Sequence, residues 1–277
     1  MVMNARTRTT VASPRARRAL LAHRIDPATV KGSGPNGRIV EADVLARVSA
    51  AAPATITSNM RRAIAQRTTE SARQIPHFYL RAEVDATMLL EIRKSIVARV
   101  EAQDRVRITL TDFLVRAVAL ALRDHPKANC IWDNDELLPI NANNVGLVMA
   151  LEEGLVIPAI SNADQLTIAI LAGQRIALQS DAEQQKRQSS IRAAISISNL
   201  GNSRVDEFDA IIPLGQSMIL GVGRTALRPF ACGERLELRQ TLKLSLALDH
   251  RVHDGAPGAQ FLQSIVEHLE QPASLLI

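Results

Sequence analysis

The chain has 277 residues, of which 47% are hydrophobic, which allows a sizeable core and excludes wholesale disorder. It contains no run of eighteen apolar residues, so the sequence predicts no membrane-spanning helix. The net charge of the chain is +5, and residues 1–48 alone carry +6, so residues 49–277 are not basic. The seven aromatic residues are too few for a base-stacking surface. The sequence therefore predicts no nucleic-acid partner.

The N-terminal part predicts a disordered basic tail, residues 1–12, followed by a small helical domain, residues 13–48. Ser13 followed by Pro14 is typical of a helix start, because a serine hydroxyl can cap the first turn and proline fits its first position. A second short helix is predicted over residues 41–48, at the end of this domain. The small residues and the proline of residues 49–58 then predict a linker.

The loop between these two predicted helices contains a glycine pattern that also occurs in dinucleotide-binding proteins. Gly32, Gly34 and Gly37 fit the spacing G-x-G-x-x-G. That motif binds pyrophosphate where a buried strand precedes it and a helix opens inside it. Here the preceding segment is polar, and Pro35-Asn36 favours a turn. We therefore interpret the glycines as residues of a tight loop and not as a nucleotide site.

Residues 59–277 predict a larger α/β domain with a mixed sheet, since helical and strand-like segments do not alternate regularly as in a doubly wound fold. The predicted helices are residues 60–71, 89–101, 110–123, 168–188 and 256–270. The predicted strands are residues 78–84, 145–149, 155–160, 194–198, 217–222 and 236–248.

The most informative stretch is Asp249-His250-Arg251, followed by His253 and Asp254, between an apolar alternating segment and an amphipathic helix. Such a junction can present side chains at a cleft on a rigid scaffold. A neutral histidine can take up a proton near neutral pH, and a carboxylate four residues later can fix its surroundings. From spacing alone, Asp254 fits an ordinary helix N-cap equally well. No metal-ligand spacing is present, so no metal site is predicted.

A second candidate lies 52 residues before His250. Ser198 ends a short alternating segment and is followed by Asn199 and Gly201, so its hydroxyl could serve as a hydrogen-bond donor. The same residues also fit an ordinary turn, and the spacing leaves both interpretations open.

Together these stretches resemble the 2-oxo acid dehydrogenase acyltransferases, the dihydrolipoamide acyltransferases, which are relatives of chloramphenicol acetyltransferase. The motifs that carry the resemblance are, in chain order, residues 60–65 with 75–78, 154–158, 196–201, 219–224 and 249–256. Residues 13–48 separately resemble the peripheral-subunit-binding domain. The resemblance implies an α/β (α+β) fold with a chloramphenicol-acetyltransferase-like, two-layer mixed sheet and helices, plus a small helical N-terminal domain.

The resemblance also implies a role for each matching residue. His250 would be the base that deprotonates the acceptor thiol or hydroxyl, which then attacks the acyl thioester of coenzyme A, the expected co-substrate. Ser198 would donate a hydrogen bond to the tetrahedral oxyanion. Asp254 would hold the histidine-bearing loop through an arginine, for which Arg61 and Arg62 are candidates. The family forms trimers, with sites between neighbouring subunits, and larger assemblies that use an apolar C-terminus such as the one here.

The chain departs from the family pattern next to Ser198, and we use these departures to predict which acceptor receives the acyl group. Residues 191–194 replace the usual G-G-T-F, and residues 202–210 are acidic where the family is rich in glycine and aromatic residues. Only twelve residues precede Ser13, so we expect no covalent lipoyl group. We therefore predict a stand-alone acyltransferase that moves acetyl, or a similar group, from coenzyme A to a hydroxyl in specialised metabolism, such as a tetronate hydroxymethyl group in antibiotic biosynthesis.

Two alternatives remain open at this point. The chain could be a dihydrolipoamide acyltransferase core subunit of a 2-oxo acid dehydrogenase complex, or a non-catalytic scaffold that holds partners through residues 13–48. Cys130 and Cys232 lie far apart, and the N-terminus has no apolar signal segment, which predicts a reduced, cytoplasmic protein. The expected partners are further copies of the chain, a protein bound by residues 13–48 and a small-molecule or carrier-bound acceptor.

Overall fold

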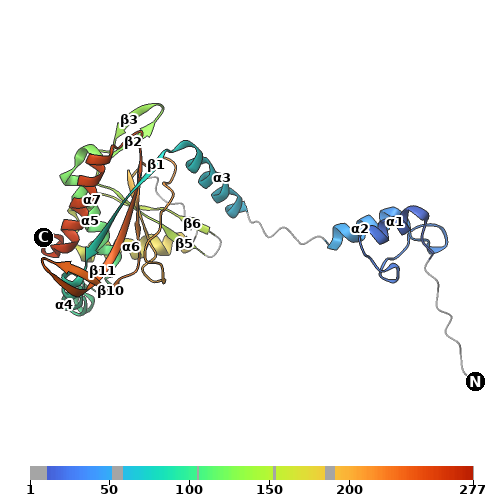
Figure 1. Cartoon of the computed structure of the whole chain (residues 1–277), viewed down its shortest axis with the longest axis horizontal. Coiled ribbons are helices and arrows are strands. Elements are labelled where there is room, and N and C mark those ends of the chain that lie inside the picture. Colours follow the sequence, from blue (N-terminus) through green and yellow to red (C-terminus); the bar gives the residue numbers. More distant parts are fainter. Residues whose placement is uncertain (1–10, 52–58, 105, 152–153, 185–190, 277) are drawn as a thin grey trace, which may run out of the picture. The chain divides into compact units, whose positions relative to one another are not determined.

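Two units, residues 1–57 and residues 58–277, make up the computed structural model of the chain. It describes residues 11–51, 59–104, 106–151, 154–184 and 191–276 (Figure 1). The predicted tail of residues 1–12 and linker of residues 49–58 therefore lie largely outside the described residues. Among the helices that are described, none is long and apolar enough to cross a bilayer.

The first unit contains helices α1 (Pro14–Ala22) and α2 (Glu41–Ala51) around a small apolar core. The Ser13 hydroxyl accepts a hydrogen bond from the Ala16 amide at 3.1 Å, so the predicted cap is present. The second helix is longer than predicted: it continues to Ala51 because the alanines after Val48 favour helix. Gly37 has a φ of +75° in the loop between the helices, which is the tight turn expected of the glycine pattern.

A seven-stranded mixed sheet forms the centre of the second unit, in the order β1-β11-β9-β8-β4-β7 with β10 paired to β11. Its strands are β1 (His77–Asp85), β4 (Val145–Leu147), β7 (Ala159–Ile160), β8 (Ile195–Asn199), β9 (Met218–Val222), β10 (Ala226–Cys232) and β11 (Arg235–Asp249). Strands β4, β8 and β9 are parallel to one another, and the remaining pairs are antiparallel. The predicted α/β class with a mixed sheet is confirmed.

Helices pack against one face of this sheet and form the main core with it (Figure 1). They are α4 (Thr87–Asp104), α5 (Leu110–Asp124), α6 (Ile168–Glu183) and α7 (Gly255–Glu270). Strand β11 presents alternate leucines to them, from Leu242 to Leu248, as the alternating sequence predicts. Helix α5 is buried along almost its whole length, because its apolar residues continue around the helix.

The opposite face of the sheet is covered by an irregular segment, residues 200–216, which we call the strap. Its backbone bonds to β9 through Leu200 and Val222 at 3.0 Å, and the Ile212 amide donates to His77 Nε2 of β1 at 3.0 Å. The strap also contacts helix α3 (Asn59–Gln74), whose Ser71 hydroxyl donates to the Ile212 carbonyl. The strap therefore connects strands that lie far apart in the chain.

The acidic side chains of the strap, noted above as a departure from the family pattern, accept hydrogen bonds from side chains in the sheet and beside it. Asp206 accepts hydrogen bonds from Arg224 and Arg228, both at 2.7 Å. These two arginines lower the pKa of the Asp206 carboxyl. Asp209 accepts a hydrogen bond from the Ser245 hydroxyl at 2.7 Å. The acidic character of residues 202–210 thus serves at least in part to attach the strap.

Two predicted strands are each divided in the structure. Residues 145–149 and 155–160 contribute β4 and β7 to the main sheet, while β5 (Met149–Leu151) and β6 (Gly154–Val156) form a separate hairpin. Pro158 lies between β6 and β7 and has no amide to donate to a ladder, which explains the break there. Its carbonyl accepts a hydrogen bond from the Leu147 amide at 2.8 Å.

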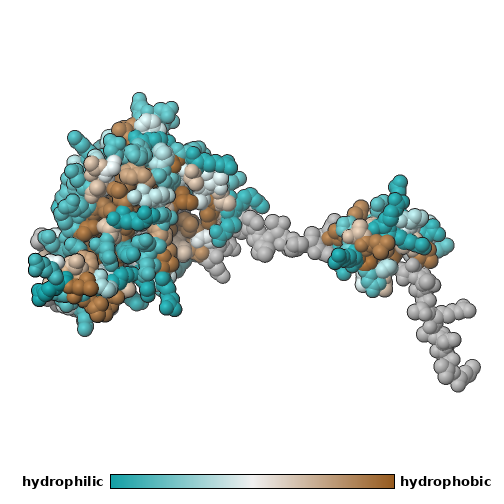
Figure 2. Space-filling model, viewed as in Figure 1, coloured by the Kyte–Doolittle hydropathy of each residue, from teal (hydrophilic) through white to brown (hydrophobic). Residues whose placement is uncertain are grey.

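Two hairpins were not predicted. The first joins β2 (Cys130–Asp133) and β3 (Glu136–Pro139) through Asn134 and Asp135, both at positive φ, a turn that asparagine and aspartate tolerate. The second joins β10 to the start of β11 and exposes a row of apolar side chains. Figure 2 shows hydrophobic residues gathered near this end of the sheet. Its exposed leucines are Leu227, Leu236 and Leu238.

Candidate active site

His250 is the first residue after β11 and is held against β1. Its amide donates to the Pro76 carbonyl at 3.0 Å, and its ring lies against Phe78, with 4.5 Å between the ring centroids and 42° between the planes. The residue is exposed to solvent. A histidine fixed on one side and accessible on the other fits the predicted role of a base that meets a diffusing acceptor.

The residues on either side of His250 form an ion pair. The Asp249 side chain is 1% exposed, and Arg251 donates to its two oxygens from Nε at 3.0 Å and from Nη2 at 2.6 Å. The hydrogen bond to Asp249 raises the pKa of the Arg251 guanidinium. The same guanidinium lies 5.7 Å from the centroid of the Trp132 ring on β2. The loop that carries His250 therefore rests on a buried, compensated charge.

His253 is a structural histidine and not a second base. It is 5% exposed, and its Nε2 lies 3.1 Å from the Ser217 hydroxyl, which itself donates to the Cys130 carbonyl at 2.5 Å. Since the hydroxyl proton is used there, Nε2 of a neutral His253 donates to Ser217. Burial lowers the pKa of His253 from 6.5 to about 4. Among the described residues, no cluster of three His, Cys, Asp or Glu side chains could hold a metal ion.

We expect His253 to make the fold sensitive to acid. The unfolded chain binds a proton at His253 below about pH 6.5, whereas the folded chain does so only near pH 4, so unfolding becomes easier as the pH falls between these values. At pH 5 the loss relative to pH 7 is about 2 kcal/mol of unfolding free energy. The measurement is urea unfolding at both pH values, at fixed protein concentration, for the wild type and His253→Gln. An equal pH dependence in the two proteins would contradict this assignment.

Ser198 lies near the end of β8 and is partly buried. The side chain of the next residue, Asn199, accepts a hydrogen bond from the Gly201 amide at 2.8 Å and donates to Thr111 Oγ1 of α5 at 3.1 Å. These bonds fix the turn that follows the serine. By contrast, Ser196 is fully buried and bonded to Gln216.

The sheet register separates Ser198 from His250. Ser198 is aligned through Gly221 of β9 with Ser245 of β11, five residues before His250 and two strands away. With about 3.3 Å per residue and 4.8 Å per strand, the two residues are roughly 15–20 Å apart within one chain. A base and an oxyanion donor must both lie about 3 Å from the reacting groups. One chain therefore does not bring the two predicted residues together.

Asp254 occupies the N-cap position of α7 and is exposed, but within the described part of the chain its side chain accepts no capping hydrogen bond. The ordinary cap considered above therefore lacks its characteristic bond. Arg62 lies near the start of α3, roughly 18 Å along the helix from Gln74, after which the chain enters β1. The pairing of Asp254 with Arg61 or Arg62 stays a prediction.

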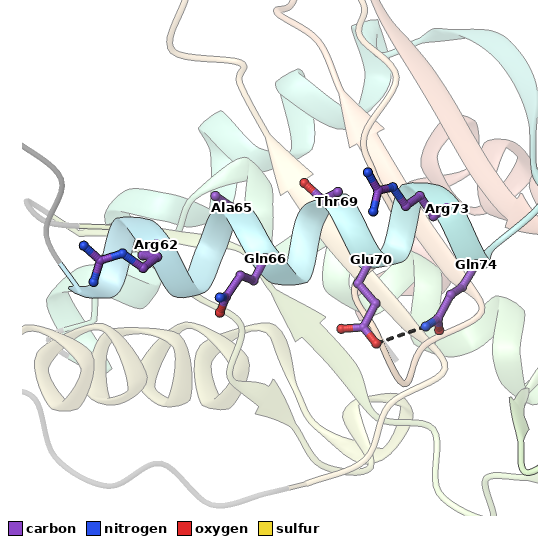
Figure 3. Close-up of a pocket in the computed structure, with 7 residues that line it drawn as sticks. All are labelled: Arg62, Ala65, Gln66, Thr69, Glu70, Arg73 and Gln74. Atoms are coloured by element: carbon purple, nitrogen blue, oxygen red, sulfur yellow. Dashed lines mark hydrogen bonds between the residues drawn. The ribbon is translucent and has the colours of Figure 1, made fainter.

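A hollow of about 610 Å³ lies along the outer side of α3 (Figure 3). Its lining residues are Arg62, Ala65, Gln66, Thr69, Glu70, Arg73 and Gln74. They come from one exposed helix and include neither His250 nor Ser198. We therefore do not assign the acyl-transfer site to this hollow.

Comparison with known proteins identifies both units. The family model described as "2-oxoacid dehydrogenases acyltransferase (catalytic domain)" matches residues 51–277, and that described as "e3 binding domain" matches residues 10–45. The dihydrolipoyllysine-residue acetyltransferase component of the pyruvate dehydrogenase complex of Rickettsia conorii is 36% identical over 280 residues. That alignment covers 96% of this chain and 68% of the relative.

Two solved structures are similar to the second unit. The dihydrolipoamide acetyltransferase of Azotobacter vinelandii has a TM-score of 0.76 and 26% identity, covering 81% of this chain and 93% of the other. The structure of that enzyme was determined to examine the role of three residues in its catalytic mechanism. They are a serine, a histidine 52 residues later and an asparagine four residues after the histidine. The cubic core of a pyruvate dehydrogenase multienzyme complex has a TM-score of 0.75 and 26% identity, with 81% and 93% covered.

Proposed function

Because this chain belongs to the 2-oxoacid dehydrogenase acyltransferase family and is an acyl-CoA-dependent acyltransferase, we propose that it transfers an acetyl group between coenzyme A and a dihydrolipoyl thiol. The observation that carries the proposal is the spacing of its candidate residues. Ser198 precedes His250 by 52 positions and Asp254 follows it by four, the same intervals as in the Azotobacter acetyltransferase. Aspartate replaces the asparagine of that protein.

The predicted acyl transfer is confirmed, but the comparisons do not support the predicted hydroxyl acceptor of specialised metabolism. They favour the alternative, a dihydrolipoamide acetyltransferase of a dehydrogenase complex. Antibiotic biosynthesis has no support among these relatives, and the non-catalytic scaffold is not retained. The departures next to Ser198 are explained in part by the ion pairs of the strap, which need no unusual acceptor.

In the proposed reaction, His250 accepts the proton of the attacking thiol, and the sulfur forms a bond with the thioester carbonyl carbon. The carbonyl oxygen becomes an oxyanion that accepts a hydrogen bond from the Ser198 hydroxyl. When the intermediate collapses, the carbon–sulfur bond of the original thioester breaks, and the leaving thiolate takes the proton from His250. The reaction is reversible, since a thiol and a thioester stand on both sides.

The register of the sheet supports a site built from two copies of the chain. Because Ser198 and His250 are roughly 15–20 Å apart within one chain, the proposed intermediate must lie between His250 of one copy and Ser198 of another. Closed symmetric assemblies provide such an interface once per subunit. We therefore propose a trimer, or a larger assembly built from trimers.

The direct test compares acceptors. With acetyl-CoA as donor, release of free coenzyme A is measured with dihydrolipoamide and, in parallel, with a hydroxymethyl tetronate. We expect turnover with dihydrolipoamide to be at least about tenfold faster, since a thiol loses its proton to histidine more readily than an alcohol does. Transfer to the alcohol with none to dihydrolipoamide would overturn the proposal.

The first unit is proposed to bind a partner subunit with an acidic surface. Its family model is described as an e3 binding domain, and α1 exposes Arg17 and Leu21, with Arg24 just beyond its end. Arg17, Leu21 and Arg24 help to line a hollow of about 550 Å³. Two cations around an exposed leucine fit a docking surface that is electrostatic at its edge and apolar at its centre.

We expect this docking to weaken as salt rises from 0.1 to 1 M, because the Debye length falls from about 10 Å to about 3 Å. Binding to the E3 subunit of a 2-oxo acid dehydrogenase complex can be measured by calorimetry for the wild type, Arg17→Ala and Leu21→Ala. In Arg17→Ala, the affinity should depend less steeply on salt concentration than in the wild type. In Leu21→Ala, the affinity should be lower at every salt concentration, with the same dependence on salt as in the wild type. A salt-independent affinity would contradict the electrostatic part of the proposal.

A further inference from the structure

The β2–β3 hairpin lies beside the loop that carries His250. We propose that Trp132 of this hairpin is a positioning residue for His250 and acts through the Arg251–Asp249 ion pair. The inference rests on the proposed role of His250 as the base. It concerns what holds that base in place, since none of these three side chains needs to touch the reacting atoms.

Asp249 is the residue at which strand β11 becomes the loop. Its amide donates to the Ser217 carbonyl at 2.9 Å, and its own carbonyl accepts from the Val252 and His253 amides at 3.0 and 2.9 Å. These three bonds define the turn in which His250 is the second residue. Any shift of Asp249 therefore moves His250 with it.

Arg251 compensates the buried charge of Asp249. The carboxylate is 1% exposed and the arginine side chain 32% exposed, so water reaches the cation but not the anion. The Arg251 amide donates to the same carboxylate at 3.0 Å. A buried carboxylate without its cation is strongly unfavourable. The loop keeps its geometry only while the guanidinium stays over the carboxylate.

Trp132 supplies the surface on which that guanidinium rests. A cation close to the face of an indole ring is attracted by the ring and loses freedom to move. The hairpin is itself fixed to the loop, since Ser217 bonds both the Cys130 carbonyl and the Asp249 amide. The hairpin is thus connected to Asp249 in two ways: through the Trp132 and Arg251 side chains, and through Ser217.

Loss of the indole should release Arg251 toward solvent and leave the Asp249 charge less compensated beside His250. A nearby negative charge favours the protonated ring, so the acidic limb of the pH profile of kcat/KM should move to higher pH. Several other charged or titratable groups lie on the elements around the loop: His77 of β1, which pairs with Asp249; Asp133, Asp135 and Glu136 of the hairpin; Arg192, which is paired with Asp133; and His253 and Asp254. None of them is altered by a substitution at Trp132.

The experiment uses the full chain in the acetyl-CoA and dihydrolipoamide assay. Trp132→Leu should lower kcat about tenfold, with KM for acetyl-CoA changed less than about twofold, because the base is misplaced while the substrate site is intact. Trp132→Phe keeps an aromatic face and should restore most of the rate. Leu137→Ala is the matched control: Leu137 faces Trp132 across the hairpin, is exposed and should leave kcat unchanged.

A double-variant cycle tests the route through Arg251. If Trp132 acts through this arginine, Trp132→Leu combined with Arg251→Gln should be no slower than Arg251→Gln alone. Fully additive losses, or a wild-type rate and pH profile in Trp132→Leu, would overturn the proposal. An equal loss in the Leu137→Ala control would also overturn it, since a general effect of the hairpin would then suffice.

Nuclear magnetic resonance of histidine-labelled protein separates this inference from the proposed function. The His250 signal, identified by its absence in His250→Gln, should titrate at higher pH in Trp132→Leu than in the wild type, without any substrate present. A wild type that is inactive on dihydrolipoamide would reject the proposed function but leave this readout standing. An unchanged titration in an active enzyme would reject the role of Trp132 alone.

Discussion

His250→Ala is expected to lower kcat for acyl transfer by about 10²–10⁴-fold, the usual contribution of a positioned general base. The thiol of dihydrolipoamide or coenzyme A is mostly protonated at neutral pH, so attack on the thioester needs a group that removes the proton as the bond forms. Such a group must be accessible to the thiol and held in position. His250 is exposed, its ring lies against Phe78, and its amide is bonded to the Pro76 carbonyl. Loss of this ring leaves the register of β11 untouched.

The control for this variant is a measurement showing that its fold is unchanged. His250 follows the last residue of β11 and its ring contributes little to the core, so the thermal midpoint and the oligomeric state should match the wild type. Raising the pH should recover part of the rate in His250→Ala, because hydroxide ionises the thiol without the base. A variant with near-normal kcat would remove His250 from the mechanism.

Ser198→Ala is expected to lower kcat by about 10²–10³-fold, since one oxyanion donor contributes about 2.7–4 kcal/mol to the transition state. The KM values should change little, because the donor is needed when the carbonyl becomes an oxyanion. Asn199→Ala is a useful neighbour. It loosens the turn after the serine but keeps the hydroxyl, so its loss in kcat should be smaller.

Together, the two inactive variants test whether the site is shared between subunits. When His250→Ala and Ser198→Ala chains are co-expressed in equal amounts with different tags, random mixing gives about one quarter of the sites an intact histidine and an intact serine. Mixed assemblies purified by both tags should therefore regain activity far above either parent. Assemblies of two differently tagged His250→Ala chains are the control. No recovery in the mixture would place both groups in one chain, against the register of the sheet.

The elements that the sequence predicted well are those whose pattern is local. Helix α5 has a continuous apolar run, α1 has its Ser13-Pro14 start, and β11 has alternating leucines, so periodicity alone locates them. The roles of the catalytic candidates came instead from the resemblance, because spacing alone could not distinguish Ser198 from an ordinary turn residue. The separation of Ser198 from His250 needed the strand order and register, which no local pattern contains.

The residues around the base show the same limit. Phe78 lies inside a recognised motif, yet its contact with His250 depends on the pairing of β1 with β11. Trp132 belongs to an unpredicted hairpin. A signal for it was present in the Asn134-Asp135 turn, with apolar Trp132 and Leu137 two residues away on either side. The burial of His253 depends on Ser217, 36 residues away, and therefore could not be read from either residue alone.

The position of β11 between β1 and β9 has a consequence for how the chain is made. Strand β1 is complete at Asp85, but its partner begins only at Arg235, and ribosomes add about 5–20 residues per second. Strand β1 therefore waits roughly 8–30 s for its partner during synthesis. Residues 11–51 form their apolar core among themselves, so that unit can fold as soon as it emerges, while the sheet that carries His250 closes only after β11 has been made.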